Sequence, residues 1–182
     1  MRMNAFSRRY ARGTSLVEVL VATVVVSMGL LGVAALQVTA LQGANDTQYR
    51  SRATDLAMSL ADRIRANPLA DNDYRIAAGG ACGAPAAICA MKPHETDGSA
   101  LDCSPQQMAT YDLWEVRCLN GAQNALPGGA LTITCTDADV TDGDDCSPNS
   151  TFALNVTWQT KSEDAGFTTE SVIMTIIPGE AL

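Results

Sequence analysis

The segment "RRYARGTSLVEVLVATVVVSMGLLGVAALQ", from Arg8 to Gln37, decides how the whole chain is interpreted. It begins with basic residues and is apolar or small and polar from Thr14 to Leu36, with one exception, the carboxylate of Glu18. The apolar run covers residues 14–41, which is long enough to cross a hydrocarbon core roughly 30 Å thick. The excess of arginine before the run predicts that the start of the chain stays in the cytoplasm and that everything after the run lies beyond the membrane.

This N-terminal segment differs from a secretory signal peptide. Its apolar run is too long, and no A-x-A cleavage site follows the run. A small residue, Gly13, instead precedes it. The sequence therefore predicts a membrane helix that remains part of the protein.

The rest of the chain is acidic and contains all the cysteines. Beyond Pro68 there are four basic and sixteen acidic residues, a net charge of −12, so we expect no nucleic-acid partner. Six cysteines lie between residues 82 and 146, and this even number after an export-like N-terminus predicts disulfides in an oxidising compartment. A metal site is the alternative, but there is no C-x-x-C and the only histidine is His94.

Two helical segments and a loop are expected before the strands. Small and apolar residues recur at steps of three and four after the apolar run, which predicts that an amphipathic helix over residues 42–67 continues the membrane helix. Residues 69–103 show no sustained period, and we interpret them as an irregular loop. A short helix is then expected to begin at Pro105, with Ser104 as its N-cap.

Three segments in the last third of the chain predict strands. They are "LTITCT" (131–136), "FALNVTWQT" (152–160) and "TTESVIMTII" (168–177), and the second alternates most cleanly, with Trp158 at the end of its apolar face. Three antiparallel strands covered by the long helix give an α+β domain over residues 68–182. We expect Trp114 and Trp158 to pack in its core.

Gly13 followed by "TSLVEVLVA" resembles the prepilin motif of type IV pilins and type II secretion pseudopilins. The resemblance implies a type IV pilin-like fold, with residues 1–13 as a leader peptide that a membrane prepilin peptidase removes between Gly13 and Thr14. It also implies N-methylation of Thr14. The family usually has phenylalanine as its first mature residue, whereas this sequence has threonine.

The position of Glu18 then has a physical explanation. A charge at the centre of a membrane helix costs about 2.5–3.5 kcal/mol, and less near the interface, where Glu18 would lie. Cleavage gives Thr14 a cationic amine one helical turn away, and two unit charges ~4 Å apart at an effective dielectric near 20 attract by about 4 kcal/mol. The amine of an incoming subunit is the other possible partner, and the family assigns that recruitment to this glutamate. The alternative is a carboxylate tolerated at the interface of an ordinary membrane anchor.

The C-terminal pattern resembles PilV-type minor pilins. It consists of a tryptophan-containing helix, "LPGG", a strand, an acidic loop and a strand containing "VTW". The resemblance implies a minor pilin at or near the pilus tip that promotes assembly. It would contact other minor and major pilins through its N-terminal helix and a PilY-type tip adhesin. It would start in the bacterial inner membrane with its C-terminal domain in the periplasm and end in the extracellular pilus.

Two other functions remain open from the sequence. One is a minor pseudopilin of a type II secretion system, which shares the N-terminal chemistry. The other is a membrane-anchored periplasmic binding or sensory domain that does not polymerise. No serine, histidine or cysteine stands in an arrangement that suggests a nucleophile and its base, so we expect neither enzymatic activity nor a cofactor.

The disulfide pairing is only partly predicted. Cys135 and Cys146 would close a short loop between two strands, a closure worth roughly 3 kcal/mol in chain-entropy models. Cys82 with Cys89 is a second local possibility, which would leave Cys103 with Cys118. If residues 105–118 are helical they span about 20 Å, too far for a bond that needs Cα atoms within about 7 Å, so these last two pairs stay open.

One loop has the composition of a calcium site. Asp137, Asp139 and Asp142 lie in "DADVTDGDD", but the EF-hand order is broken by an extra residue and no glutamate follows at the right distance. We interpret the segment as a solvated acidic loop, with weak calcium binding as the alternative.

Overall fold

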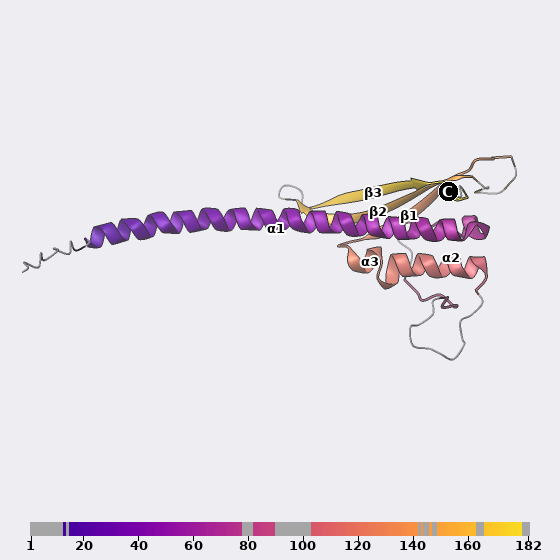
Figure 1. Ribbon diagram of the computed structural model, residues 1–182, viewed down its shortest axis with the longest axis horizontal. Helices are drawn as coiled ribbons and strands as arrows, with labels where there is room; N and C mark the ends of the chain where they lie inside the picture. Colours follow the sequence, from indigo (N-terminus) through magenta and orange to yellow (C-terminus); the bar gives the residue numbers. More distant parts are fainter. Residues whose placement is uncertain are drawn as a thin grey trace, which may run out of the picture. The chain divides into compact units, whose positions relative to one another are not determined.

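The computed structural model describes residues 13, 15–77, 82–89, 103–141, 143, 146, 149–162 and 166–179. The chain divides into two compact units, Met1–Ala44 and Asn45–Leu182. Helix α1 (Leu16–Ala66) begins in the first unit and ends in the second (Figure 1).

The described part of the first unit consists almost entirely of apolar helix. Its side chains are exposed throughout, and by length and composition α1 is able to cross a membrane. The hydroxyl groups in this stretch donate to carbonyl groups of the preceding turn: Thr23 to Leu20 at 2.8 Å and Ser27 to Thr23 at 2.7 Å. These hydroxyl donors are therefore satisfied within the helix, as a lipid environment requires.

In the second unit, α1 buries a narrow stripe of mostly small side chains. The stripe follows the expected steps of three and four and consists of Ala53, Ala57, Leu60, Ala61 and Ile64. In Figure 1 this part of α1 runs between the sheet and the shorter helices, and all three contribute to one hydrophobic core.

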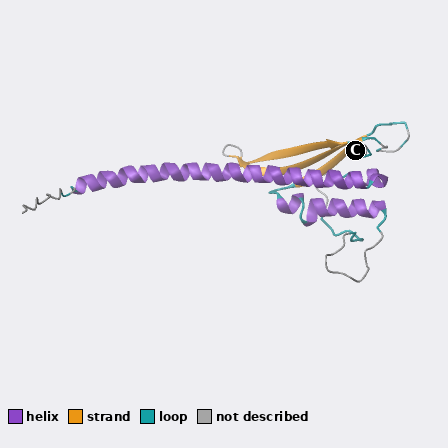
Figure 2. Ribbon diagram, in the orientation of Figure 1, coloured by secondary structure: helices purple, strands orange, loops and turns teal. Residues whose placement is uncertain are grey.

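The sheet has three antiparallel strands in the order β1-β2-β3, as Figure 2 shows in orange. Their bounds are β1 (Ala130–Thr136), β2 (Thr151–Ser162) and β3 (Gly166–Ile176). On β2 the alternating residues from Phe152 to Trp158 are all buried. The predicted α+β architecture, with a long helix packed on a small antiparallel sheet, is confirmed. Trp158 lies in the core, whereas Trp114 is only half-buried.

The predicted short helix is present but changes geometry. α2 (Pro105–Trp114) begins with Ser104 as N-cap, and Gln107 completes a reciprocal capping box. A π-helical turn, η2 (Glu115–Leu119), follows, and then α3 (Ala122–Ala125). Gly121 joins them, and a Cβ at this position would overlap the carbonyl group of Val116. Only glycine fits this close approach of the backbone.

The interpretation of residues 69–103 as an irregular loop is wrong for its first part. A 3₁₀ helix, η1 (Pro68–Tyr74), follows α1 directly, and Ile76 forms an isolated antiparallel bridge to Ile133. The side chain of Tyr74 is fully buried and fixes this segment against the core. A seven-residue element is too short to show a period in the sequence.

Three disulfides occur in the described residues. They are Cys82–Cys118, Cys89–Cys103 and Cys135–Cys146. The suggested local pair of Cys82 with Cys89 does not form. The pair Cys103–Cys118 is also absent, and residues 105–119 are indeed helical, which separates these two cysteines.

Candidate functional site

The first candidate site is the start of α1. Gly13 is exposed, and Thr14 lies outside the described residues. The backbone N–H of Glu18 donates to the hydroxyl of Ser15 at 3.2 Å and to its carbonyl oxygen at 3.0 Å. Ser15 therefore caps the helix, and Glu18 falls in the first helical turn.

This geometry gives Glu18 a role that the sequence analysis missed. Ser15 and Glu18 have the S-x-x-E spacing of a capping box, which could have been read from the sequence, and the structure shows the bond from the Glu18 backbone N–H to the Ser15 hydroxyl. A carboxylate in the first turn also interacts favourably with the helix dipole, worth typically 0.3–1 kcal/mol. The pairing of Glu18 with the amine of Thr14 involves a residue outside the described part and stays a prediction.

The exposed apolar surface of α1 follows directly after this cap. Each large apolar side chain from residue 16 to 41 has an exposed fraction of about half or more, and that of Leu16 is 90%. They are Leu16, Val17, Val19, Leu20, Val21, Val24, Val25, Val26, Met28, Leu30, Leu31, Val33, Leu36, Val38 and Leu41. A continuous apolar surface of this length has to be covered by lipid or by protein.

A second cluster joins the end of α1 to α2. The guanidinium of Arg63 donates to the carboxylates of Asp112 at 2.7 Å and Glu115 at 2.8 Å. The hydroxyl of Tyr74 donates to the other oxygen of Asp112 at 2.8 Å, and Asn67 donates to the Tyr74 oxygen at 3.2 Å. Asp112, whose carboxylate is almost fully buried, thus accepts hydrogen bonds from one charged donor, Arg63, and one neutral donor, Tyr74.

The pKa values in this cluster follow from burial and pairing. Burial alone would lower the pKa of Arg63, but the hydrogen bonds to Asp112 and Glu115 outweigh it and raise the pKa. Burial, aided by the bond to Asp112, raises the pKa of Tyr74 well above its ordinary value. Both shifts favour the ordinary neutral-pH forms of Arg63 and Tyr74, as in a structural cluster rather than a site of proton transfer.

Residues 35–114 match a protein-family model described as Tt1218-like, type IV pilin Tt1218. The matched segment runs from the apolar part of α1 through η1 to the last residue of α2, and it includes Arg63, Tyr74 and Asp112. Over this segment, which is less than half of the chain, the protein is similar to the type IV pilin family. No curated protein and no solved structure matches it.

Pilins of this family are structural proteins, so the expectation that this chain is not an enzyme is confirmed. The similarity to this family also implies interaction with other pilins. The cluster of Arg63, Asp112, Glu115 and Tyr74 is accordingly interpreted as structural.

Two carboxylates of the acidic loop, those of Asp137 and Asp139, form hydrogen bonds within the loop and its flanks. Asp137 accepts from the hydroxyl of Ser150 at 3.0 Å, and Asp139 accepts from the backbone N–H and the hydroxyl of Thr141 at 3.0 and 2.6 Å. The bonds from Thr141 lower the pKa of Asp139. Asp142 lies outside the described residues, and among those described no three potential metal ligands gather.

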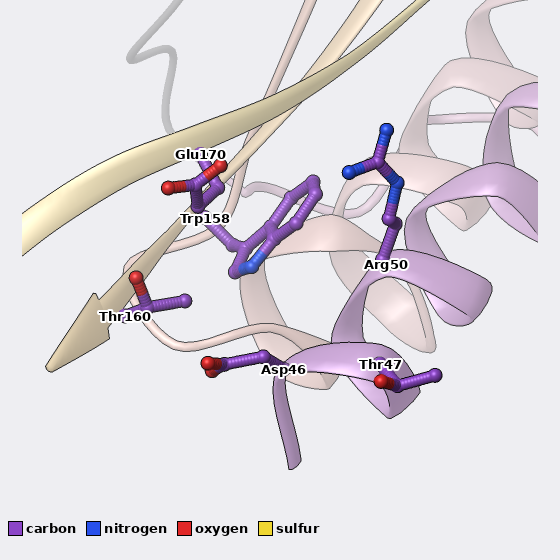
Figure 3. A pocket seen from close by; sticks show the side chains of 6 residues that line it. All are labelled: Asp46, Thr47, Arg50, Trp158, Thr160 and Glu170. Atoms are coloured by element: carbon purple, nitrogen blue, oxygen red, sulfur yellow. The ribbon is translucent and has the colours of Figure 1, made fainter. Parts of the chain in front are cut away.

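A pocket of about 330 Å³ opens between α1 and the sheet in the second unit. Figure 3 shows its lining, which comes from α1, β2 and β3: Asp46, Thr47, Arg50, Trp158, Thr160 and Glu170. Trp158 is 3% exposed, and its indole N–H has no hydrogen-bond partner among the described residues. The sequence predicted Trp158 as a core residue but gave no indication that its polar edge borders a pocket.

Proposed function

We propose that this chain is a minor pilin, a subunit that enters a type IV pilus at or near its tip and promotes pilus assembly with other minor pilins. One observation carries the proposal: α1 presents an exposed apolar surface from residue 16 to 41 that starts with a capped turn containing Glu18 and is preceded by Gly13.

The apolar surface requires two successive environments. Lipid covers it while the precursor waits in the inner membrane, with residues 1–13 in the cytoplasm and the acidic domain in the periplasm. Similar helices cover it in the filament, where the same side chains pack against one another. The change exchanges one apolar contact for another, and dispersion and packing between helices then favour the bundle.

Cleavage between Gly13 and Thr14 prepares the transfer of the helix from lipid into the filament. It removes four arginines that resist passage of the chain end into an apolar bundle, and it leaves a single amine at Thr14. Glu18 is exposed in the first turn and is available to the amine of a neighbouring subunit. In the proposed filament this pair fixes the axial position of each new subunit.

Placement near the tip rests on the resemblance of the C-terminal pattern to PilV-type minor pilins. The partners there would be other minor pilins and a PilY-type adhesin. A minor pseudopilin of a type II secretion system would use the same N-terminal chemistry, so the experiment has to separate these two functions.

Mass spectrometry of the protein from cell envelopes and from sheared surface filaments tests the proposal. We expect a chain that begins at Thr14 and is N-methylated, and we expect it in sheared filaments at a small fraction of the major subunit. Cells that lack the prepilin peptidase are the control and should retain the leader. A leader retained in cells with active peptidase would identify a simple anchor. A processed chain that is absent from filaments but required for secretion would identify a pseudopilin.

A further inference from the structure

Strand β3 is an edge strand without the usual protection. Among the described residues it pairs only with β2, along its whole length from Gly166 to Ile176, so its other side presents a row of backbone donors and acceptors. Edge strands are normally protected by proline, lysine or a bulge. β3 contains neither proline nor lysine, and its only charged residue is Glu170. Its composition of threonine, valine and isoleucine favours a further strand beside it.

Glu170 connects this edge to the pocket between α1 and the sheet. In the β2–β3 register Glu170 lies opposite Trp158 and Thr168 lies opposite Thr160, so Glu170, Trp158 and Thr160 share the face of the sheet that borders the pocket. A residue on an added strand directly opposite Glu170 would point to this same face. Its side chain would enter the pocket.

The chemistry of the pocket favours a cationic side chain. Asp46 and Glu170 contribute two carboxylates, and among the described residues neither forms an ion pair. Figure 3 shows Asp46 and Thr160 on the nitrogen side of the Trp158 indole and Arg50 on the other side. With one guanidinium and two carboxylates, the lining has a net charge of −1. The aliphatic stem of a lysine or arginine could pack on Trp158 while its charged end meets the two carboxylates.

We propose that the free edge of β3 binds an extended segment of a partner protein, with a lysine or arginine opposite Glu170 whose side chain occupies this pocket. A second copy of β3 does not fit this description, because residues 166–176 contain no basic residue. The backbone pairing supplies affinity, and the pocket supplies selectivity for the basic side chain. The inference depends only on residues of the unit Asn45–Leu182 and holds whether or not the chain polymerises through its apolar helix.

Two peptides test the proposal on the full chain in detergent micelles. Both have nine residues, blocked ends and alternating threonine and valine; one has a central lysine and the other a central glutamate. We expect the lysine peptide to bind at least about five-fold more tightly and to slow amide hydrogen exchange along β3. The variant Glu170→Lys should reverse the preference. Asp55→Lys, which changes an exposed carboxylate of α1 outside the pocket, is the matched control and should leave the preference unchanged.

Three outcomes would overturn the proposal. Equal affinity for the two peptides would show that the pocket does not select charge. Binding of neither peptide, with unaltered exchange along β3 and intact disulfides by mass spectrometry, would show that the edge does not accept a strand. Protection of β3 that rises with protein concentration in the absence of peptide would assign the edge to a second copy of the chain.

Discussion

Replacing Arg63 by methionine tests the buried ion-pair cluster that joins α1 to α2. The substitution keeps most of the aliphatic stem but removes the donor to Asp112 and Glu115. The Asp112 side chain is only 8% exposed and would keep a single neutral donor, the Tyr74 hydroxyl. Breaking a fully buried ion pair from one side costs about 3–5 kcal/mol. Arg63 itself is 30% exposed and water can partly replace it, so we expect a loss of about 2–3 kcal/mol.

Urea unfolding of the full chain in micelles at pH 7, followed by far-UV circular dichroism and tryptophan fluorescence, measures this loss. The double variant Arg63→Met with Asp112→Asn should recover part of it, because a neutral amide no longer leaves a charge buried without its partner. Arg65→Met is the matched control. Arg65 pairs with Asp62 at 3.3 Å on the surface, where the two side chains are 49% and 77% exposed, and its loss should cost under about 0.5 kcal/mol.

Equal destabilisation by Arg63→Met and Arg65→Met would refute the reasoning. So would a double variant whose loss equals the sum of the two single losses, since additivity would mean that Arg63 and Asp112 do not interact energetically.

Three further predictions concern single residues. The raised pKa of Tyr74 means that its contribution to stability is complete below the ordinary tyrosine pKa near 10 and declines as the pH rises above it. Tyr74→Phe should therefore flatten the fall of the urea midpoint above about pH 10. Gly121→Ala should destabilise the domain by roughly 1–3 kcal/mol and lower its thermal midpoint, because the added Cβ would overlap the Val116 carbonyl. Gly83→Ala is the control: the space around Gly83 is open, so the thermal midpoint should change little. Glu18→Ala should leave leader cleavage intact but lower the amount of protein in sheared filaments, measured by quantitative immunoblots. Unchanged incorporation would contradict the proposed pairing of this carboxylate with the amine of a neighbouring subunit.

The sequence predicted the elements that bury a continuous face. The alternation from Phe152 to Trp158 and the apolar run after Gly13 are local patterns, and each corresponds to one element of the structure. The N-cap at Ser104 was predicted for the same reason, since capping depends on residues within one turn.

Features that depend on distant partners were not predictable in this way. Arg63 and Asp112 are 49 residues apart, and nothing near either of them indicates the other. The bond from Cys82 to Cys118 spans 36 residues and depends on where η1 and the π-helical turn place the two backbones. Helix length gave an argument against the pair Cys103–Cys118, but sequence reasoning left that pairing open and could not select the correct partner.

The hydroxyl groups inside α1 have a consequence for the movement of a subunit. Thr23, Ser27 and Thr39 each donate to a carbonyl of their own helix, at 2.8, 2.7 and 3.2 Å. None of these donors needs a lipid headgroup, a water molecule or a neighbouring chain. The helix can therefore rotate about its axis, or be withdrawn from one apolar surrounding into another, without breaking these polar contacts. In the proposed filament, such helices could slide past one another with these hydrogen bonds intact, and the resistance would come from the fit of their apolar side chains.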